Sequence, residues 1–286
     1  MKSILPRAII FSLTFFYIAL QISTAQVSYT NSFSELPGGD VLRPEGGKSP
    51  WFIGIDGGIT YSSFSGGPVL LGPLKNPHRL TATRKAFVDE GNGLGFYIGG
   101  AVDFPLSKSV GIVGKLNYHT RSGNFSSTTR EITPPSILPP YPADTMDFAQ
   151  DTKWTFNYIG IDLLLRVQLI DKSLYLIGGF GFANLSKNNV KLDERMLTPN
   201  HYYFEDSQAP NYLINKITTL SSETEIVNLN KNRFDFKIGA GTWIPISDKL
   251  FLTPEVMFAL PITKFSNDFE YKMMTLFATI GLRWQM

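Results

Sequence analysis

Hydrophobic and polar residues alternate with a period of two along most of the chain after position 50. One face of the first such segment is apolar and comprises Trp51, Ile53, Ile55, Ile59 and Tyr61. After Phe52 the intervening positions are small or polar, as at Asp56, Thr60 and Ser62. Because successive side chains of a strand point to opposite faces, the pattern predicts β-strands with one apolar and one polar face.

Eight segments alternate in this way: 51–62, 93–106, 109–119, 159–169, 174–185, 234–246, 250–260 and 274–286. Strands of soluble domains average about five or six residues, whereas a tilted membrane-spanning strand needs about 9–11. The segment lengths therefore favour a transmembrane β-barrel, and a secreted soluble β-sandwich is the alternative. Pro254 lies inside the seventh segment and is expected to mark a bulge there.

The connections between these segments alternate between short and long. Short turns are expected at 105–109, 170–173 and 247–249, and long connections at 64–92, 122–153 and 186–232. The last connection, 263–268, is short. Short turns at one end and long loops at the other are typical of an outer-membrane barrel. An even number of strands places both termini at the short-turn, periplasmic end. Segments 212–220 and 225–229 are also compatible with a hairpin above the membrane, whose insertion would give ten strands.

The polar faces of the predicted strands carry charges that would point into a barrel. They are Asp56, Asp103, Lys115, Asp162, Arg166, Asp235, Lys237, Glu255 and Arg283. An eight-stranded barrel is just wide enough for its side chains to fill it, so these five acids and four bases must pair or stay hydrated. A salt-bridged plug and a narrow polar path are both consistent with them.

Aromatic residues lie near both ends of the apolar faces. They are Trp51, Phe104 and Trp284 near the short turns, and Tyr61, Tyr118 and Phe234 near the long loops. Two such girdles are expected where a barrel wall meets the two membrane interfaces.

The first 50 residues differ from the rest. Lys2 and Arg7 precede an apolar run over 8–20, and Ser23-Thr24-Ala25 supplies small residues at a cleavage spacing. This pattern predicts a signal peptide over 1–25. Residues 26–50 are polar and rich in glycine and proline, and are expected to form a flexible periplasmic leader before a barrel domain over 51–286.

The amino-acid composition limits the kinds of functional site that the chain can contain. The chain has no cysteine, which excludes disulfides and thiol nucleophiles. Charged residues make up 17 %, and the 26 basic and 24 acidic residues balance once Lys2 and Arg7 are set aside, so nucleic-acid binding is not expected. Of the three histidines, His119 is interpreted as a rim residue beside the long loops rather than as part of a His–Ser dyad. We expect no catalytic residue, no metal site and no cofactor.

These segments resemble the outer-membrane β-barrel domain family of Gram-negative bacteria, the OmpA/OmpX/OmpW-like eight-stranded barrels, over residues 50–286. The resemblance rests on pattern rather than on a motif. It extends to the alternating C-terminus, where Leu282, Trp284 and Met286 are similar to the signal read by the barrel-assembly machinery, although the aromatic residue stands two places before the end.

The resemblance implies an all-β, eight-stranded antiparallel up-and-down barrel in the bacterial outer membrane, with both termini in the periplasm. It also implies a monomer whose partners are outer-membrane lipids, including lipopolysaccharide, and the barrel-assembly machinery. The expected role is non-catalytic, either structural or in surface interaction through long extracellular loops. A narrow porin-like channel for small solutes is the first alternative, and a lipid-modifying enzyme is the second.

Overall fold

The computed structural model describes residues 50–66, 69–70, 87–88, 90–107, 109–132, 145–169, 173–198, 217–224, 226, 229–266 and 271–286. The predicted signal peptide and nearly all of the predicted leader lie outside these ranges. Within them, no helix has both the length and the apolar character needed to cross a bilayer.

The described residues fold into antiparallel strands. In chain order they are β1 Phe52–Gly66, β2 Val69–Leu70, β3 Phe87–Val88, β4 Gly91–Pro105, β5 Val110–Ile132, β6 Thr145–Gln168, β7 Leu174–Thr198, β8 Ile217–Thr224, β9 Asn232–Thr242, β10 Ile244–Ser247, β11 Leu250–Pro261 and β12 Tyr271–Gln285. The pair β2–β3 forms a separate small sheet.

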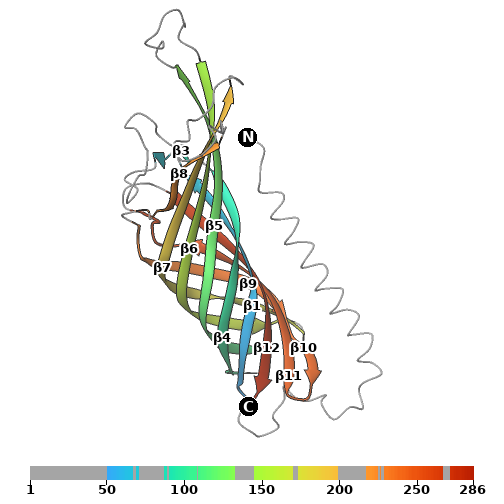
Figure 1. The fold of residues 1–286 in the computed structure, drawn as a ribbon. Helices are drawn as coiled ribbons and strands as arrows, with labels where there is room; N and C mark the ends of the chain where they lie inside the picture. Colours follow the sequence, from blue (N-terminus) through green and yellow to red (C-terminus); the bar gives the residue numbers. More distant parts are fainter. Residues whose placement is uncertain are drawn as a thin grey trace, which may run out of the picture.

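The main sheet closes into a ring (Figure 1). The order around the ring is β1-β4-β5-β6-β7-β9-β11-β12, and β12 pairs with β1 along all of Phe52–Gly66. Strand β10 continues β9 beyond Trp243 and pairs with β11, as β9 does. Counting β9 and β10 as one strand, the described ring has eight strands, and the predicted antiparallel up-and-down barrel is confirmed.

The two faces of the wall follow the predicted alternation. Outward apolar side chains such as Leu94, Ile161 and Leu163 are 67 %, 59 % and 65 % exposed, whereas the inward residues between them are buried. On β6 the outward residues are apolar from Ile159 to Leu169. Ten steps of about 3.3 Å along a strand tilted by about 40° span about 25 Å, which is the height of the apolar band of an outer-membrane barrel.

The prediction of long connections at 122–153 and 186–232 was wrong over much of their length. Strands β5, β6 and β7 have 23, 24 and 25 residues, and the β5–β6 ladder continues to Ile132↔Thr145. Strand β8 pairs with β7 over Val190–Arg195 instead of entering the ring, so the ten-strand alternative does not apply. We call residues 124–132 of β5, 145–153 of β6 and 190–198 of β7, together with β8, the outer wall (Figure 1).

The prediction of a bulge at Pro254 was also wrong. The β11–β12 register runs without a shift from Leu250↔Trp284 to Ala259↔Thr275. On the other side of β11, the neighbouring strand is interrupted at Trp243, between β9 and β10. Proline has no N–H to donate, so an interrupted ladder on one side takes the place of a bulge.

Candidate functional site

The nine predicted charged residues of the barrel interior come together in the lumen. Each of these side chains is buried, at 8 % exposure or less: Asp56, Asp103, Lys115, Asp162, Arg166, Asp235, Lys237, Glu255 and Arg283. The strands place them there because each occupies an inward position of the alternation on β1, β4, β5, β6, β9, β11 or β12. We call this set, with the two residues added below, the lumen charge layer.

Lys115 is the centre of one ion-pair group. Its ammonium contacts the carboxylate of Glu255 and lies 3.1 Å from Asp56. Asp56 also accepts a hydrogen bond from Arg283, and the Tyr175 hydroxyl donates to Glu255 at 2.7 Å. Each charge therefore has an opposite partner, as burial requires.

Two further pairs hold four more of the predicted residues. Arg166 lies 2.8 Å from Asp103, and its guanidinium carbon is 4.9 Å from the ring centre of Trp243. Lys237 lies 2.6 Å from Asp162, and its ammonium is 4.7 Å from the ring centre of Phe277. Both cations therefore combine an ion pair with a cation–π contact.

Two cations of the lumen charge layer were missed by the sequence analysis. Arg121 and Arg233 both contact Asp235, each at 2.7 Å. With them, the described lumen has six bases against five acids. Both residues continue the inward phase of their strands: Arg121 follows Lys115 by six positions, and Arg233 precedes Asp235 by two. Extending the alternation past its apolar members would have found them.

His119 is not a rim residue, contrary to the prediction. It is 0 % exposed, and its ring stacks between Tyr97 and Tyr158, at 6.3 and 5.5 Å between centroids. Arg121 Nε donates to His119 Nε2 at 3.1 Å, and His119 Nδ1 lies 2.8 Å from Asn117 Oδ1. Since Nε2 accepts, these contacts assign the proton to Nδ1 and the neutral form to the ring.

The histidine belongs to a hydrogen-bonded chain along the lumen. Asn117 donates to Asp162 at 3.1 Å, so Asp235, Arg121, His119, Asn117 and Asp162 form one continuous series. Both ring nitrogens of His119 are occupied. The arrangement orders the interior and leaves no nitrogen to activate a nucleophile.

Aromatic clusters close the lumen on both sides of the charge layer. At the end with the short turns, Phe52, Trp243 and Phe251 lie 5.0–5.7 Å apart. At the other end the buried cluster is larger and contains Phe64, Phe125, Trp154, Phe156, Phe265 and Tyr271. We call this second cluster the aromatic cap. Buried aromatic side chains therefore lie at both ends of the lumen charge layer.

A few buried polar atoms in the lumen have no hydrogen-bond partner among the described residues. They include the Tyr97 hydroxyl, Asp103 Oδ1 and Arg121 Nη1, which lie at the charge layer, and Trp154 Nε1 in the aromatic cap. Buried polar groups are normally satisfied, often by water. These atoms mark the positions where the packed lumen can accept water molecules.

The six residues predicted as aromatic girdles face outward, near the two ends of the apolar band. Trp51 and Phe104 stack at 5.9 Å beside the short turns, where Trp284 is 52 % exposed. At the other end Tyr118 contacts Phe96 at 5.7 Å, Phe234 contacts Phe182 at 5.0 Å, and Tyr61 lies opposite Leu94.

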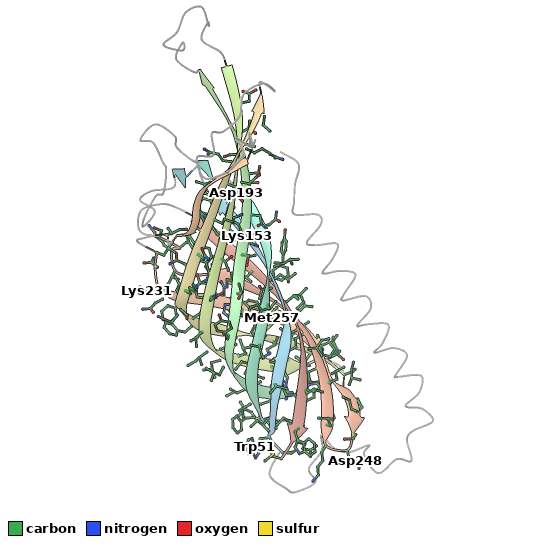
Figure 2. The ribbon with its side chains drawn as sticks, viewed as in Figure 1. Trp51, Lys153, Asp193, Lys231, Asp248 and Met257 are labelled. Carbon is green, nitrogen blue, oxygen red and sulfur yellow. The ribbon has the colours of Figure 1, made fainter. Side chains whose placement is uncertain are left out.

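The outward face of the outer wall is polar and charged. Lys153 lies directly opposite Lys191, and Asp151 directly opposite Asp193. Lys191 contacts Asp193 at 2.7 Å along its own strand, and Ser126 donates to Asp151 at 2.7 Å. Figure 2 shows Lys153 and Asp193 on the upper part of the strands, with Trp51 and Asp248 at the opposite end.

No group of three or more histidine, aspartate or glutamate side chains among the described residues is arranged to hold a metal ion. The carboxylates of the lumen charge layer are occupied by lysine and arginine instead.

Comparison with known proteins adds the family. A family model described as outer membrane protein beta-barrel domain matches residues 25–267. No curated protein matches the chain. Among solved structures, the chain is similar to Ail of Yersinia pestis, with 12 % identity, a TM-score of 0.29, and coverage of 82 % of this chain and 98 % of that one.

It is also similar to Neisserial surface protein A, NspA, with 9 % identity, a TM-score of 0.35, and coverage of 82 % and 97 %. It is similar as well to OprG of Pseudomonas aeruginosa, with 9 % identity, a TM-score of 0.30, and coverage of 84 % of this chain and 98 % of that one. The family match covers most of the chain and agrees with the closed antiparallel ring and its apolar outer face. The chain belongs to the outer membrane protein beta-barrel domain family, and its place is the bacterial outer membrane.

Proposed function

We propose that the protein is a sealed, non-catalytic outer-membrane barrel that presents the outer wall at the cell surface for interaction with other surfaces. The observation that carries this proposal is the outer wall itself. Strands β5 and β6 continue beyond the ring in register, and β7 stays paired with β6 through two register shifts, whereas β9 has only 11 residues. A hydrogen-bonded wall is a rigid support for a binding surface.

The filled lumen supports the sealed state. The aromatic cap covers one side of the lumen charge layer, and Phe52, Trp243 and Phe251 cover the other. An ion would have to displace packed aromatic rings at both ends as well as break ion pairs.

The same packing supports a non-catalytic role. His119 is buried with both nitrogens hydrogen-bonded, and each carboxylate of the lumen charge layer faces a cation. A lipid-modifying activity needs a nucleophile and a base that substrate can reach. The buried groups of the described lumen do not offer this access.

We also propose an orientation of the barrel in the membrane and the partners that it contacts. The outer wall faces the outside, and both termini and the short turns face the periplasm. The C-terminal strand closes the ring at β1, and Met286 N donates to Trp51 O at 2.9 Å. The barrel is inserted by the barrel-assembly machinery and works as a monomer among outer-membrane lipids, including lipopolysaccharide. Its exposed apolar band is covered by acyl chains.

The test is a truncation designed from the register. Ser126 and Asp151 lie directly opposite each other, so Asn-Gly in place of residues 127–150 can join them as a two-residue hairpin. We expect bacteria expressing this variant to lose retention on bare glass and settling by self-association, compared with bacteria expressing the full chain. The control is the shift in gel mobility between boiled and unboiled protein, which should persist.

Equal retention and settling with and without residues 127–150 of the outer wall would overturn the surface role. Conductance of the full chain in planar bilayers tests the sealed state, and no steady current is expected. A steady current would favour the second candidate, a narrow channel for small solutes. That candidate is supported by the buried lumen atoms that have no hydrogen-bond partner among the described residues, such as Tyr97 Oη and Arg121 Nη1, because water can satisfy them.

A further inference from the structure

Three lysines lie on adjacent strands just above the apolar band. Lys187 is on β7, Lys231 directly precedes β9, and Lys264 follows β11, and these strands are neighbours in the ring. All three side chains are exposed. Below them, beyond Asn184 and Asn232, the outward residues are apolar: Phe182, Phe234, Leu260 and Ile262. The lysines therefore stand at the border between the band and the polar rim; Figure 2 shows Lys231 on the flank of the wall.

Backbone and amide contacts fix the spacing of this patch. Leu185 N donates to Lys231 O at 2.7 Å, which ties the patch to β7. The side chain of Asn230, next to Lys231, donates to Lys264 O at 2.7 Å. The Asn230 backbone also donates to Phe265 O at 3.1 Å. Adjacent strands lie about 4.8 Å apart, so flexible lysine side chains on them can converge on one anion.

Asparagines add hydrogen-bonding groups between the lysines. Asn184 Nδ2 donates to Asn232 Oδ1 at 2.8 Å on the exposed face of β7 and β9. This contact uses one donor of Asn184 and the oxygen of Asn232. Within the described part of the chain, the amide hydrogens of Asn232 have no acceptor, so they point to a ligand or to solvent.

Among the described residues, no ion pair neutralises the positive charge of the patch. None of the three lysines forms an ion pair with a described residue, in contrast to Lys191 and Lys237, which do. The acidic residue of β9, Asp235, is buried in the lumen and is held by two arginines. A cationic, amide-lined patch at the edge of an apolar band is complementary to a phosphorylated sugar headgroup whose acyl chains lie along the band.

We propose that Lys187, Lys231 and Lys264, with the amides of Asn184 and Asn232, bind the phosphates of lipopolysaccharide in the outer leaflet. This inference rests on the orientation given under the proposed function, with the outer wall at the cell surface. It assigns one partner to one flank, β7-β9-β11, rather than a uniform lipid shell.

The test uses the full chain purified in detergent and titrated with rough-type lipopolysaccharide, with binding followed by native mass spectrometry. The variant is K187Q/K231Q/K264Q. The matched control, K153Q/K191Q/K249Q, removes the same charge from the outer wall and from the short-turn end. Since each surface cation contributes to headgroup binding, we expect the patch variant to bind at least about tenfold more weakly, and the control to change less than about twofold.

Removal of the phosphates from the same lipid should weaken binding to the unmodified chain as much as the patch variant does. Equal weakening in both triple variants, or no weakening after phosphate removal, would overturn the proposal. Retention of the heat-dependent mobility shift shows that the variants are folded.

Orientation is tested separately on intact cells. The chain has no cysteine, so K153C introduces a unique thiol on the outer wall. Labelling by a membrane-impermeant maleimide is expected. If K153C is not labelled while the detergent titration gives the expected result, the orientation fails and the phosphate site stands. If it is labelled and the titration shows no effect, the site fails alone.

Discussion

At the scale of single residues, the lumen charge layer is held by reciprocal pairing. Lys115 illustrates this because its buried ammonium lies between two carboxylates, Asp56 and Glu255. Removing one member of such a group leaves the others charged, buried and short of a partner. The loss of stability is therefore set by the buried charges that are left without a partner, and it is larger than the free energy of the contact itself.

We predict that Lys115→Ala lowers the free energy of unfolding by about 3–5 kcal/mol. The measurement is urea unfolding of the detergent-solubilised protein, followed by tryptophan fluorescence. Lys249→Ala is the control because Lys249 is exposed at the short turn, and its change should stay within about 0.5 kcal/mol. Equal urea midpoints for Lys115→Ala and Lys249→Ala would show that the lumen charges contribute nothing to stability.

The aromatic cap makes a second residue-scale prediction. Trp154 is 0 % exposed and contacts Phe125 at 4.5 Å and Phe265 at 6.0 Å between ring centroids. Trp154→Ala should cost about 3–5 kcal/mol because a large cavity replaces the indole ring. Trp284→Ala is the matched control, since Trp284 faces lipid and leaves no buried cavity. An equal loss in both would mean that the cap is not packed as described.

At the scale of elements, the seam between β1 and β12 depends on close backbone approach. A Cβ atom added at Gly58 would lie 2.2 Å from Ala278 O, whereas one added at the adjacent Gly57 meets nothing within 4 Å. Both glycines are in the same strand and pair with the same partner, β12. They therefore separate the effect of crowding from that of a lost glycine.

We predict that Gly58→Ala destabilises the folded barrel by about 1–3 kcal/mol and that Gly57→Ala does not. The readout is the temperature at which the unboiled, fast-migrating band is lost on a gel. If Gly57→Ala lowers that temperature as much as Gly58→Ala, the seam is not limited by contact with Ala278.

The elements also show how far the sequence predicts the fold. The apolar outward residues marked all eight ring strands, because acyl chains demand apolar side chains at every second position of the band. Above the band this demand ends: Asn124, Ser126 and Asp151 face water, yet the backbone ladder continues. The strands therefore continue where the apolar pattern stops, and Arg121 was missed for the same reason.

The sequence pattern does not predict which charged residues of the lumen pair with one another. Alternation places Lys115 and Lys237 inside, but their partners Glu255 and Asp162 come from strands on other parts of the ring. Which charges meet depends on the stagger of the strands in the closed barrel. No local signal in a single chain contains that stagger.

At the scale of the whole molecule, we expect the ring to be stable without the end of the outer wall. The ring closes on itself through strand pairing and has buried residues inside, whereas β8 pairs only with β7 among the described strands. We predict that replacement of residues 127–150 by Asn-Gly changes the urea midpoint of the ring little, by less than about 1 kcal/mol in free energy. A loss as large as that of Trp154→Ala would show that the outer wall holds the ring together.

The seam has a consequence for biogenesis. Phe52 pairs with Gln285, so the first strand of the ring has its partner at the far end of the chain. During export β1 emerges early and waits, with an unpaired edge and an apolar face, until β12 has crossed the inner membrane. Such a chain cannot fold piece by piece as it is secreted. We expect a periplasmic chaperone to hold it, and we expect a chain that lacks residues 271–286 to leave both edges open and to aggregate or be degraded instead of entering the membrane.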